Sequence, residues 1–166
     1  ARIGPIYEGT NGIQAWDLMR RKLPLRDGEV LSEYLADLRE IIPTLESSGT
    51  DAISIAKNLS TAIDALESAS RWALGTLAKA PRDAAAGASD YLRLMGMVCG
   101  GWHLANAALK SSAAGASAEQ GENRFALARI YADRDLTRAQ GMATALQSGS
   151  DTLYRLNPTP RGIHLT

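Results

Sequence analysis

The chain has 166 residues, of which 45% are hydrophobic and 22% charged, a composition typical of a globular protein with a sizeable core. Its 18 basic residues equal its 18 acidic residues, which argues against nucleic acid or an anionic membrane as a partner. Polar residues or glycine interrupt each apolar run well before the roughly 18 residues of a membrane span. Cys99 is the single cysteine, so it cannot form a disulfide within the chain, and we predict a cytoplasmic location.

A short arm precedes the first predicted helix, which spans roughly residues 11–23. Glu8 lies in this arm between an apolar lead-in and Gly9, as a buried catalytic base can be presented. Thr10 is predicted as the helix N-cap, and the N–H groups of residues 11–13 would favour an anion or a polar nucleotide group. Only seven residues precede Glu8. Because a substrate pocket needs walls, we expect the chain to be the C-terminal piece of a larger enzyme.

Two long apolar stripes follow. The first predicts a helix that Pro43 bends or ends late. The second predicts a helix of about 28 residues, with Thr50 or Asp51 as its N-cap and an end before Pro81. The first stripe consists of Leu31, Tyr34, Leu35, Leu38, Ile41, Ile42 and Leu45, and the second of Ile55, Leu59, Ala62, Ile63, Leu66, Ala69, Ala73 and Leu77.

A third helix, predicted over roughly residues 83–112, is apolar nearly all round and therefore belongs in the middle of a bundle. Glycines inside a helix cost roughly 1 kcal/mol each relative to alanine. We therefore expect a neighbouring backbone to approach Gly96, Gly100 and Gly101 closely. Residues 111–121 are predicted as a loop because they are rich in Ala, Ser and Gly.

A fourth stripe predicts one more long helix, followed by a turn at residues 148–150 and a short piece through Leu156. The last ten residues are predicted to be irregular because they contain Pro158, Pro160 and Gly162. No long polar–apolar alternation predicts a strand. We therefore predict an all-α fold, an antiparallel bundle of about four long helices preceded by a short arm and helix. The fourth stripe consists of Phe125, Ala128, Ala132, Leu136, Ala139, Ala143 and Leu146.

The run Arg2-Ile3-Gly4-Pro5-Ile6-Tyr7-Glu8-Gly9-Thr10-Asn11-Gly12-Ile13-Gln14-Ala15 closely resembles the late segment of acyl-CoA dehydrogenases, flavoenzymes that desaturate acyl thioesters at the α,β position. Residues 91–94, 100–102 and 128–132 look like the C-terminal extension of a larger bacterial subgroup, which resembles methylmercaptopropionyl-CoA dehydrogenase. The resemblance divides the chain into residues 1–24, the end of the catalytic region, and residues 25–166, a helical bundle extension.

The resemblance implies that Glu8 is the general base that removes the α-proton of an acyl-CoA substrate while the β-hydrogen leaves as hydride to FAD. It also implies that Gly9 contacts substrate and that Thr10, Asn11 and Gly12 contact FAD. By the same resemblance, electron-transfer flavoprotein is the electron acceptor, and we expect a homo-oligomer. Without the resemblance, Glu8 would be interpreted as a solvated or capping carboxylate ahead of a helix.

Other polar or aromatic residues have structural interpretations. Trp16, Trp72 and Trp102 are predicted as core or interface anchors, and Cys99 as an inert buried thiol. His103 and His164 lack partners at ligand spacing, so no metal site is predicted. Further expected surface features are Arg20-Arg21-Lys22, which could border a nucleotide phosphate, and a solvated cluster of local ion pairs formed by Arg129, Asp133, Arg134, Asp135 and Arg138.

Two functions are consistent with these features. In the first, the chain is the C-terminal section of an FAD-dependent acyl-CoA dehydrogenase, contacts the rest of that enzyme and is inactive alone. In the second, it is a non-catalytic helical interaction or oligomerisation module. Under the first, we expect residues 1–24 to dock poorly on the bundle of this chain or to borrow the surface of another copy.

Overall fold

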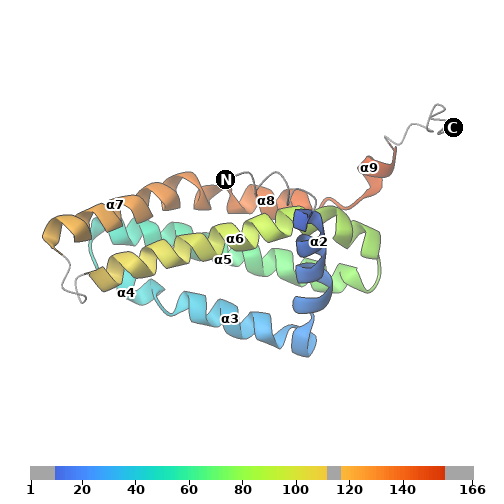
Figure 1. Cartoon of the computed structure of the whole chain (residues 1–166), viewed down its shortest axis with the longest axis horizontal. Coiled ribbons are helices and arrows are strands. Elements are labelled where there is room, and N and C mark those ends of the chain that lie inside the picture. Colours follow the sequence, from blue (N-terminus) through green and yellow to red (C-terminus); the bar gives the residue numbers. More distant parts are fainter. Residues whose placement is uncertain (1–9, 112–116, 156–166) are drawn as a thin grey trace.

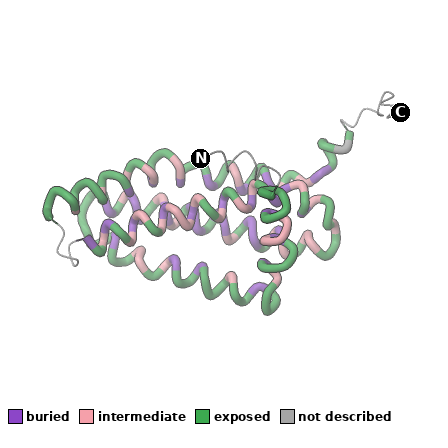
Figure 2. The backbone as a smooth tube through the Cα atoms, in the orientation of Figure 1, coloured by how far each residue is buried: buried purple, intermediate pink, exposed green. Residues whose placement is uncertain are grey.

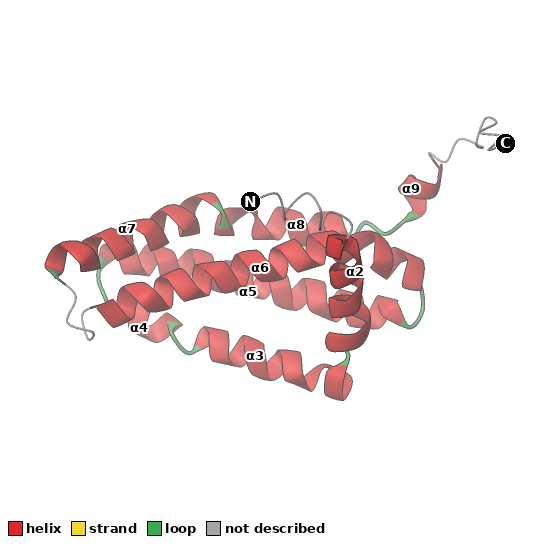
Figure 3. Cartoon of the chain, viewed as in Figure 1, coloured by secondary structure: helices red, strands yellow, loops and turns green. Residues whose placement is uncertain are grey.

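The computed structural model describes residues 10–111 and 117–155 (Figure 1). Within these ranges each regular element is a helix, and Figure 3 shows no strand there. The predicted all-α fold is therefore confirmed. None of the helices within these ranges is both long enough and apolar enough to span a membrane.

Helices α5 (Thr50–Leu77) and α6 (Pro81–Ser111) form the centre of the bundle and run antiparallel, because three residues connect them. α5 has the predicted length of 28 residues. Its N-cap is Gly49, however, so the prediction of Thr50 or Asp51 at that position was wrong. α6 packs against α2, α5, α7 and α8, which confirms the prediction that this helix lies in the middle of the bundle.

Helices α7 (Ala118–Arg134) and α8 (Ala139–Leu146) follow one another along α6, with the short 3-10 helix η3 (Leu136–Arg138) between them. The fourth stripe is thus interrupted at Asp135 rather than forming one helix. α7 also begins earlier than predicted, because Ser117 and Gln120 form a reciprocal capping box, with Gln120 N–H donating to Ser117 Oγ at 3.2 Å. Residues 118–121, predicted as loop, are helical.

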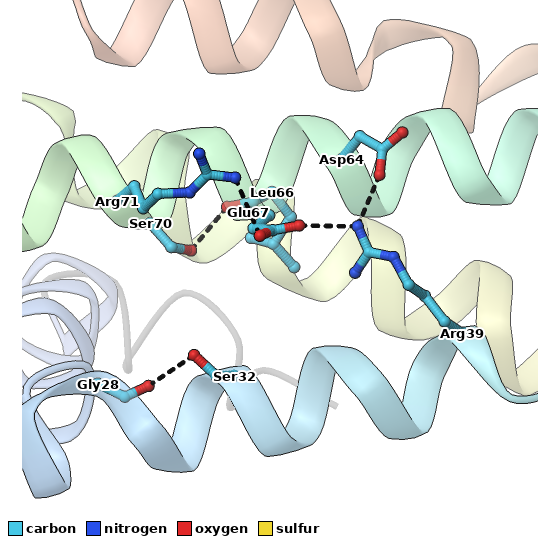
Figure 4. A network of polar contacts seen from close by, with 8 residues as sticks. All are labelled: Gly28, Ser32, Arg39, Asp64, Leu66, Glu67, Ser70 and Arg71. Carbon is cyan, nitrogen blue, oxygen red and sulfur yellow. Dashed lines mark hydrogen bonds and ion pairs between the residues drawn. The ribbon is translucent and has the colours of Figure 1, made fainter.

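Helix α3 (Glu29–Arg39) lies beside α5, and the short helix α4 (Ile42–Glu46) follows it. The stripe from Leu31 to Leu45, predicted as one helix that Pro43 bends or ends late, is divided between the two: α3 ends at Arg39, and Pro43 sits in the first turn of α4. Figure 4 shows Arg39 of α3 donating to Asp64 at 2.6 Å and to Glu67 at 2.8 Å, both on α5. The last described element is the short helix α9 (Asp151–Arg155).

The core runs along the inward faces of α5 and α6 (Figure 2). More than half of the buried hydrophobic residues in the described ranges are alanines, so the helices can approach one another closely. The large buried side chains fill the space between them. These include Tyr91, Met19, Leu38, Leu45, Ile55, Leu59, Ile63, Leu66, Leu94, Leu136, Leu146 and Val98.

The glycines of α6 allow close approach, but not as predicted. A Cβ at Gly100 would lie 2.9 Å from the Tyr131 hydroxyl, and one at Gly101 would lie 2.8 Å from both Cδ atoms of Leu136, so side chains rather than backbone approach these positions. A Cβ at Gly96 would meet nothing within 4 Å. The close backbone approach occurs at Gly87, whose Cβ would lie 2.8 Å from the Leu146 carbonyl oxygen.

Candidate active site

The predicted site residues Thr10, Asn11 and Gly12 form the first turn of helix α2 (Thr10–Asp17) and are exposed. Glu8 and Gly9, the predicted base and substrate contact, lie outside the described residues. Thr10 is helical, and its predicted role as N-cap stays a prediction because residue 9 lies outside the described ranges.

Packing within the described chain does not require a glycine at position 12. A Cβ there would meet nothing within 4 Å. The neighbouring Ile13 is 68% exposed, the highest value among the exposed large hydrophobic residues described. The first described residues of α2 therefore combine open space at a glycine with an uncovered apolar side chain. These features suit contact with a group outside the described residues.

The opposite face of the leading segment is buried in the bundle. α2 continues into a π-helical turn, η1 (Leu18–Lys22), and both pack against α6. Ala15 and Met19 are 0% exposed and Leu23 is 3% exposed. The expectation that this arm docks poorly is therefore wrong for residues 10–23. These residues fold into the core of their own chain, because the sequence supplies apolar side chains at the inward positions.

A π turn lies between the buried residues Met19 and Leu23. The Leu23 N–H donates to the Leu18 carbonyl oxygen at 2.8 Å, five residues earlier. Ala15, Met19 and Leu23 are four residues apart, a spacing that also puts residues on one face of a regular α-helix, and Lys22 is exposed. π turns of this kind are frequent at functional sites.

A left-handed bend separates the leading segment from α3. Arg26 and Asp27 have positive φ angles of 49° and 56°, and Gly28 has a φ of 91°. Positive φ is costly for residues with a side chain. A Cβ at Gly28 would also lie 2.8 Å from Leu74 Cδ1 of α5. The bend therefore fits tightly onto α5 and fixes the direction in which the chain enters α3.

The three cationic residues at the end of the leading segment, Arg20, Arg21 and Lys22, are exposed, as expected. Arg21 pairs with Asp17 one turn earlier at 2.9 Å. This pair is solvated and contributes less than about 1 kcal/mol to stability. The cluster leaves a positive charge near the junction with α3.

The remaining candidates have structural roles. The three tryptophans pack against the core while remaining partly exposed, as predicted for anchors. Cys99 is half-buried rather than fully buried, and its Sγ lies 3.0 Å from the Tyr34 hydroxyl. Burial and this contact raise the pKa of Tyr34 to about 12. Within the described ranges, no group of histidine, cysteine or acidic residues could hold a metal ion, and His164 lies outside them.

The predicted cluster of local ion pairs turns out to bridge two helices. Arg129 of α7 pairs with Asp133 at 2.6 Å and reaches Asp51 of α5 at 3.0 Å. Asn58 of α5 donates to Asp133 at 3.0 Å. These carboxylates raise the pKa of the Arg129 guanidinium, the hydrogen bond to Asp133 being the main cause. The cluster therefore joins α5 to α7 and contacts none of the predicted site residues.

A pocket of about 520 Å³ that the sequence did not suggest lies where α5 ends and α6 begins. Trp72, Lys79 and Asp83 line it together with the turn at residues 147–151. Asp83 accepts hydrogen bonds from the hydroxyl and from the backbone N–H of Ser150, which lower its pKa. The carboxylate thus ties the turn before α9 to the start of α6, a structural role.

Comparison with known proteins connects this architecture to a family. Residues 31–157 match the family described as "Acetyl-CoA dehydrogenase C-terminal like". The chain belongs to this acyl-CoA dehydrogenase C-terminal family. The match begins inside α3, after α2 and η1, and continues through α9.

A curated relative, 3-methylmercaptopropionyl-CoA dehydrogenase of Ruegeria pomeroyi, is 35% identical over 159 residues. The similarity covers 92% of this chain but only 26% of the relative. The chain thus spans about a quarter of the length of this dehydrogenase. The resemblance found in the sequence to acyl-CoA dehydrogenases and their C-terminal extension is confirmed.

Proposed function

We propose that the chain is the C-terminal section of an FAD-dependent acyl-CoA dehydrogenase that desaturates an acyl-CoA thioester at the α,β position. The family match over residues 31–157 carries this proposal, supported by the named dehydrogenase with 35% identity. In this assignment, residues 1–24 belong to the catalytic region and residues 25–166 to the helical extension. The isolated chain is inactive, because the remaining walls of the substrate pocket come from other parts of the enzyme.

Glu8 is the proposed general base. The α-proton of a thioester is weakly acidic, so a carboxylate can remove it only when charge on the carbonyl oxygen is stabilised. Backbone N–H groups supply such stabilisation without carrying charge themselves. Gly9, which has no side chain, allows the thioester to approach the backbone beside the base.

Thr10, Asn11 and Gly12 are the proposed contacts for FAD. Their exposure at the start of α2, together with the open space at Gly12, fits a polar nucleotide group lying against a helix end. FAD, when bound, accepts the hydride from the β-carbon of the substrate. The residues of this chain would hold the group and direct backbone donors toward it.

The proposed partners follow from the same assignment. The substrate is an acyl-CoA thioester, which agrees with the substrate named in the relative from Ruegeria pomeroyi. We further propose a cytoplasmic homo-oligomer that passes electrons to electron-transfer flavoprotein. In this assignment, the acyl-channel walls that select chain length come from other parts of the enzyme.

The test uses the full-length protein that contains this chain, purified with its flavin. Absorbance of the bound flavin tests whether the protein binds FAD. Dye-coupled oxidation of a panel of saturated acyl-CoA thioesters, including 3-methylmercaptopropionyl-CoA, tests whether it is an acyl-CoA dehydrogenase. Glu8→Gln is expected to retain flavin and to lower kcat by about 10²–10⁴-fold, the usual contribution of a general base. Glu122→Gln, at an exposed glutamate on α7, is the matched control and should keep full activity.

Unchanged turnover in Glu8→Gln would exclude Glu8 as the base. A full-length protein that binds no flavin would overturn the dehydrogenase assignment and favour a non-catalytic helical interaction module. The isolated 166-residue chain, assayed in parallel, should show no oxidation of acyl-CoA.

A further inference from the structure

The pocket of about 520 Å³ at the end of α5 has no role in the proposed function. One wall consists of the last two turns of α5 and the connection that follows, and another is the turn before α9. Its volume lies within the range of about 300–1,000 Å³ that is typical of small-molecule sites. The described residues that line it include none of the predicted site residues. The pocket therefore has the size of a ligand site and no assigned ligand.

We propose that this pocket binds a nucleotide, with the base against Trp72 and the phosphate groups at Arg71 and Lys79. A nucleotide combines a flat aromatic base, ribose hydroxyl groups that donate hydrogen bonds, and phosphate oxygens that carry negative charge. The described residues of the pocket supply a matching group for each of these parts. The inference does not depend on the proposed dehydrogenase activity, because it concerns other residues and a different part of the fold.

The wall formed by α5 offers an aromatic surface for the base. Trp72, Gly75 and Thr76 recur at spacings of three and four residues, so they lie along one face of the helix. The Trp72 indole packs against the core and yet remains partly exposed. Nucleotide bases stack on aromatic side chains of this kind, whatever the identity of the base. The anchored indole is therefore a stacking platform at the edge of the pocket.

Gly75 leaves the same face open beside the indole. A glycine within a helix lowers its stability relative to alanine. A Cβ at Gly75 would meet nothing within 4 Å, so packing among the described residues does not require a glycine here. A base that lies flat against the helix backbone would require it, because a side chain would fill the same space.

Two cations are available for the phosphate groups. Lys79 is exposed and has no ion-pair partner among the described residues. Arg71 pairs with Glu67 at 2.9 Å (Figure 4), but 74% of its side chain is exposed, so this pair is weak and the guanidinium can accept another partner. The two cations are eight residues apart, about 12 Å along a helix. Their long side chains can therefore both reach a phosphate-bearing group that lies between them.

The carboxylates of the pocket are compatible with this ligand. Asp83 accepts two hydrogen bonds from Ser150, so its charge is already used to hold the turn. Asp151 is exposed at the start of α9, and acidic side chains accept hydrogen bonds from ribose hydroxyls in dinucleotide sites. An adjoining hollow of about 470 Å³ shares Asp83 and Asp151 with the pocket and adds the cation Arg82.

The test measures nucleotide binding to the 166-residue chain, whose described helices share one buried core. Isothermal titration calorimetry gives the Kd of adenosine 3′,5′-bisphosphate, of ADP and of inorganic phosphate. Both nucleotides are expected to bind at least about tenfold more tightly than inorganic phosphate, which has no base to stack. A preference for the bisphosphate would identify the nucleotide end of coenzyme A as the source of the ligand, and a preference for ADP would identify a free nucleotide.

Gly75→Ala separates binding from stability. The added methyl group should raise Tm, because alanine favours the helix, and should weaken nucleotide binding about tenfold, because it occupies the space of the base. Gly96→Ala is the matched control. A Cβ at Gly96 also meets nothing within 4 Å, but this glycine does not line the pocket, so Tm should rise while Kd stays unchanged.

Two further variants each remove one contact with the ligand. Trp72→Leu and Lys79→Ala should each weaken nucleotide binding by about tenfold. Lys57→Ala, at an exposed lysine of α5 outside the pocket, should leave Kd unchanged. If Trp72→Leu does not fold, Lys79→Ala and Gly75→Ala keep the comparison, because both alter exposed positions.

Three results would each overturn the nucleotide site: no heat of binding with either nucleotide, equal Kd values for the nucleotides and inorganic phosphate, or an unchanged Kd in Gly75→Ala. None of them bears on the proposed dehydrogenase. That proposal is decided by the flavin and by Glu8→Gln in the full-length protein.

Discussion

The two sides of α6 are packed differently. Toward α7, η3 and α8, glycines let single groups of the neighbouring elements come very close, as at Gly87 and Gly101. The face that contains Cys99 instead carries the large, partly buried residues Met95 and Trp102. Cys99 meets Tyr34 of α3 on that face.

The difference shows where the bundle tolerates change. Atoms in close contact with backbone or with a buried side chain have little free space to move into, because protein interiors are as dense as organic crystals. A face of half-buried long side chains can adjust by changing rotamers. Substitutions on the glycine side should therefore cost more free energy of unfolding than substitutions on the open side.

Gly87→Ala should produce the largest loss of stability. Its Cβ would lie 2.8 Å from the carbonyl oxygen and 3.3 Å from the Cβ of Leu146, so the last turn of α8 must move. Overpacking of this kind costs about 1–3 kcal/mol, and we expect the upper end because the contact is with backbone. Urea unfolding of the 166-residue chain measures the change. Equal stability of the variant and the parent would show that α8 is not fixed at this point.

Gly101→Ala should cost less, about 1 kcal/mol, because its Cβ would meet the flexible end of Leu136 at 2.8 Å. The added methyl group also favours the helix by roughly 1 kcal/mol, which offsets part of the clash. Leu136→Val removes a methylene from the crowded side chain. In a double-mutant cycle monitored by urea unfolding, the two changes should couple favourably. If the changes in unfolding free energy of the two single variants simply add in the double variant, the contact between position 101 and Leu136 is contradicted.

Gly96→Ala should stabilise the chain. A Cβ at this position meets nothing within 4 Å, so only the gain in helix propensity remains, up to roughly 1 kcal/mol. A thermal melt of the variant should show a higher Tm than that of the parent. A lower Tm would mean that another group contacts this position in solution.

Tyr34→Phe should have the smallest effect at neutral pH, less than about 1 kcal/mol, because it removes one hydrogen bond to a thiol. The pKa of Tyr34 is raised from 10.0 to about 12, so its neutral form is favoured in the folded chain. Its contribution is therefore complete below pH 10 and is lost as the pH rises toward 12. The difference between parent and variant in unfolding free energy should shrink over this range. A constant difference would contradict the raised pKa.

The sequence predicted the helices well wherever burial follows the helical period. Ile55, Leu59 and Leu66 were assigned to the inward face of α5 and are at most 1% exposed. The break at Asp135 was missed because the apolar stripe continues in phase across it. The start of α7 could have been found, since Ser117 and Gln120 stand at the spacing of a capping box.

The candidate site depended on a family motif rather than on periodicity. The position of Glu8 between an apolar lead-in and Gly9 is compatible with a catalytic base and with a solvated or capping carboxylate, and the family motif favours the base. The burial of Met19 was within reach of sequence analysis, because Ala15, Met19 and Leu23 recur every four residues. The π turn was not, because an additional residue per turn leaves no sequence pattern distinct from an ordinary helix.

The position of Trp16 gives the leading helix an optical label of its own. This indole lies on α2 and packs against the core while remaining partly exposed, and the other two tryptophans lie on α5 and α6. In a chain in which Trp72 and Trp102 are replaced by phenylalanine, the tryptophan fluorescence would come from α2 alone. Its emission wavelength and quenching by acrylamide would then follow the attachment and release of this helix in real time.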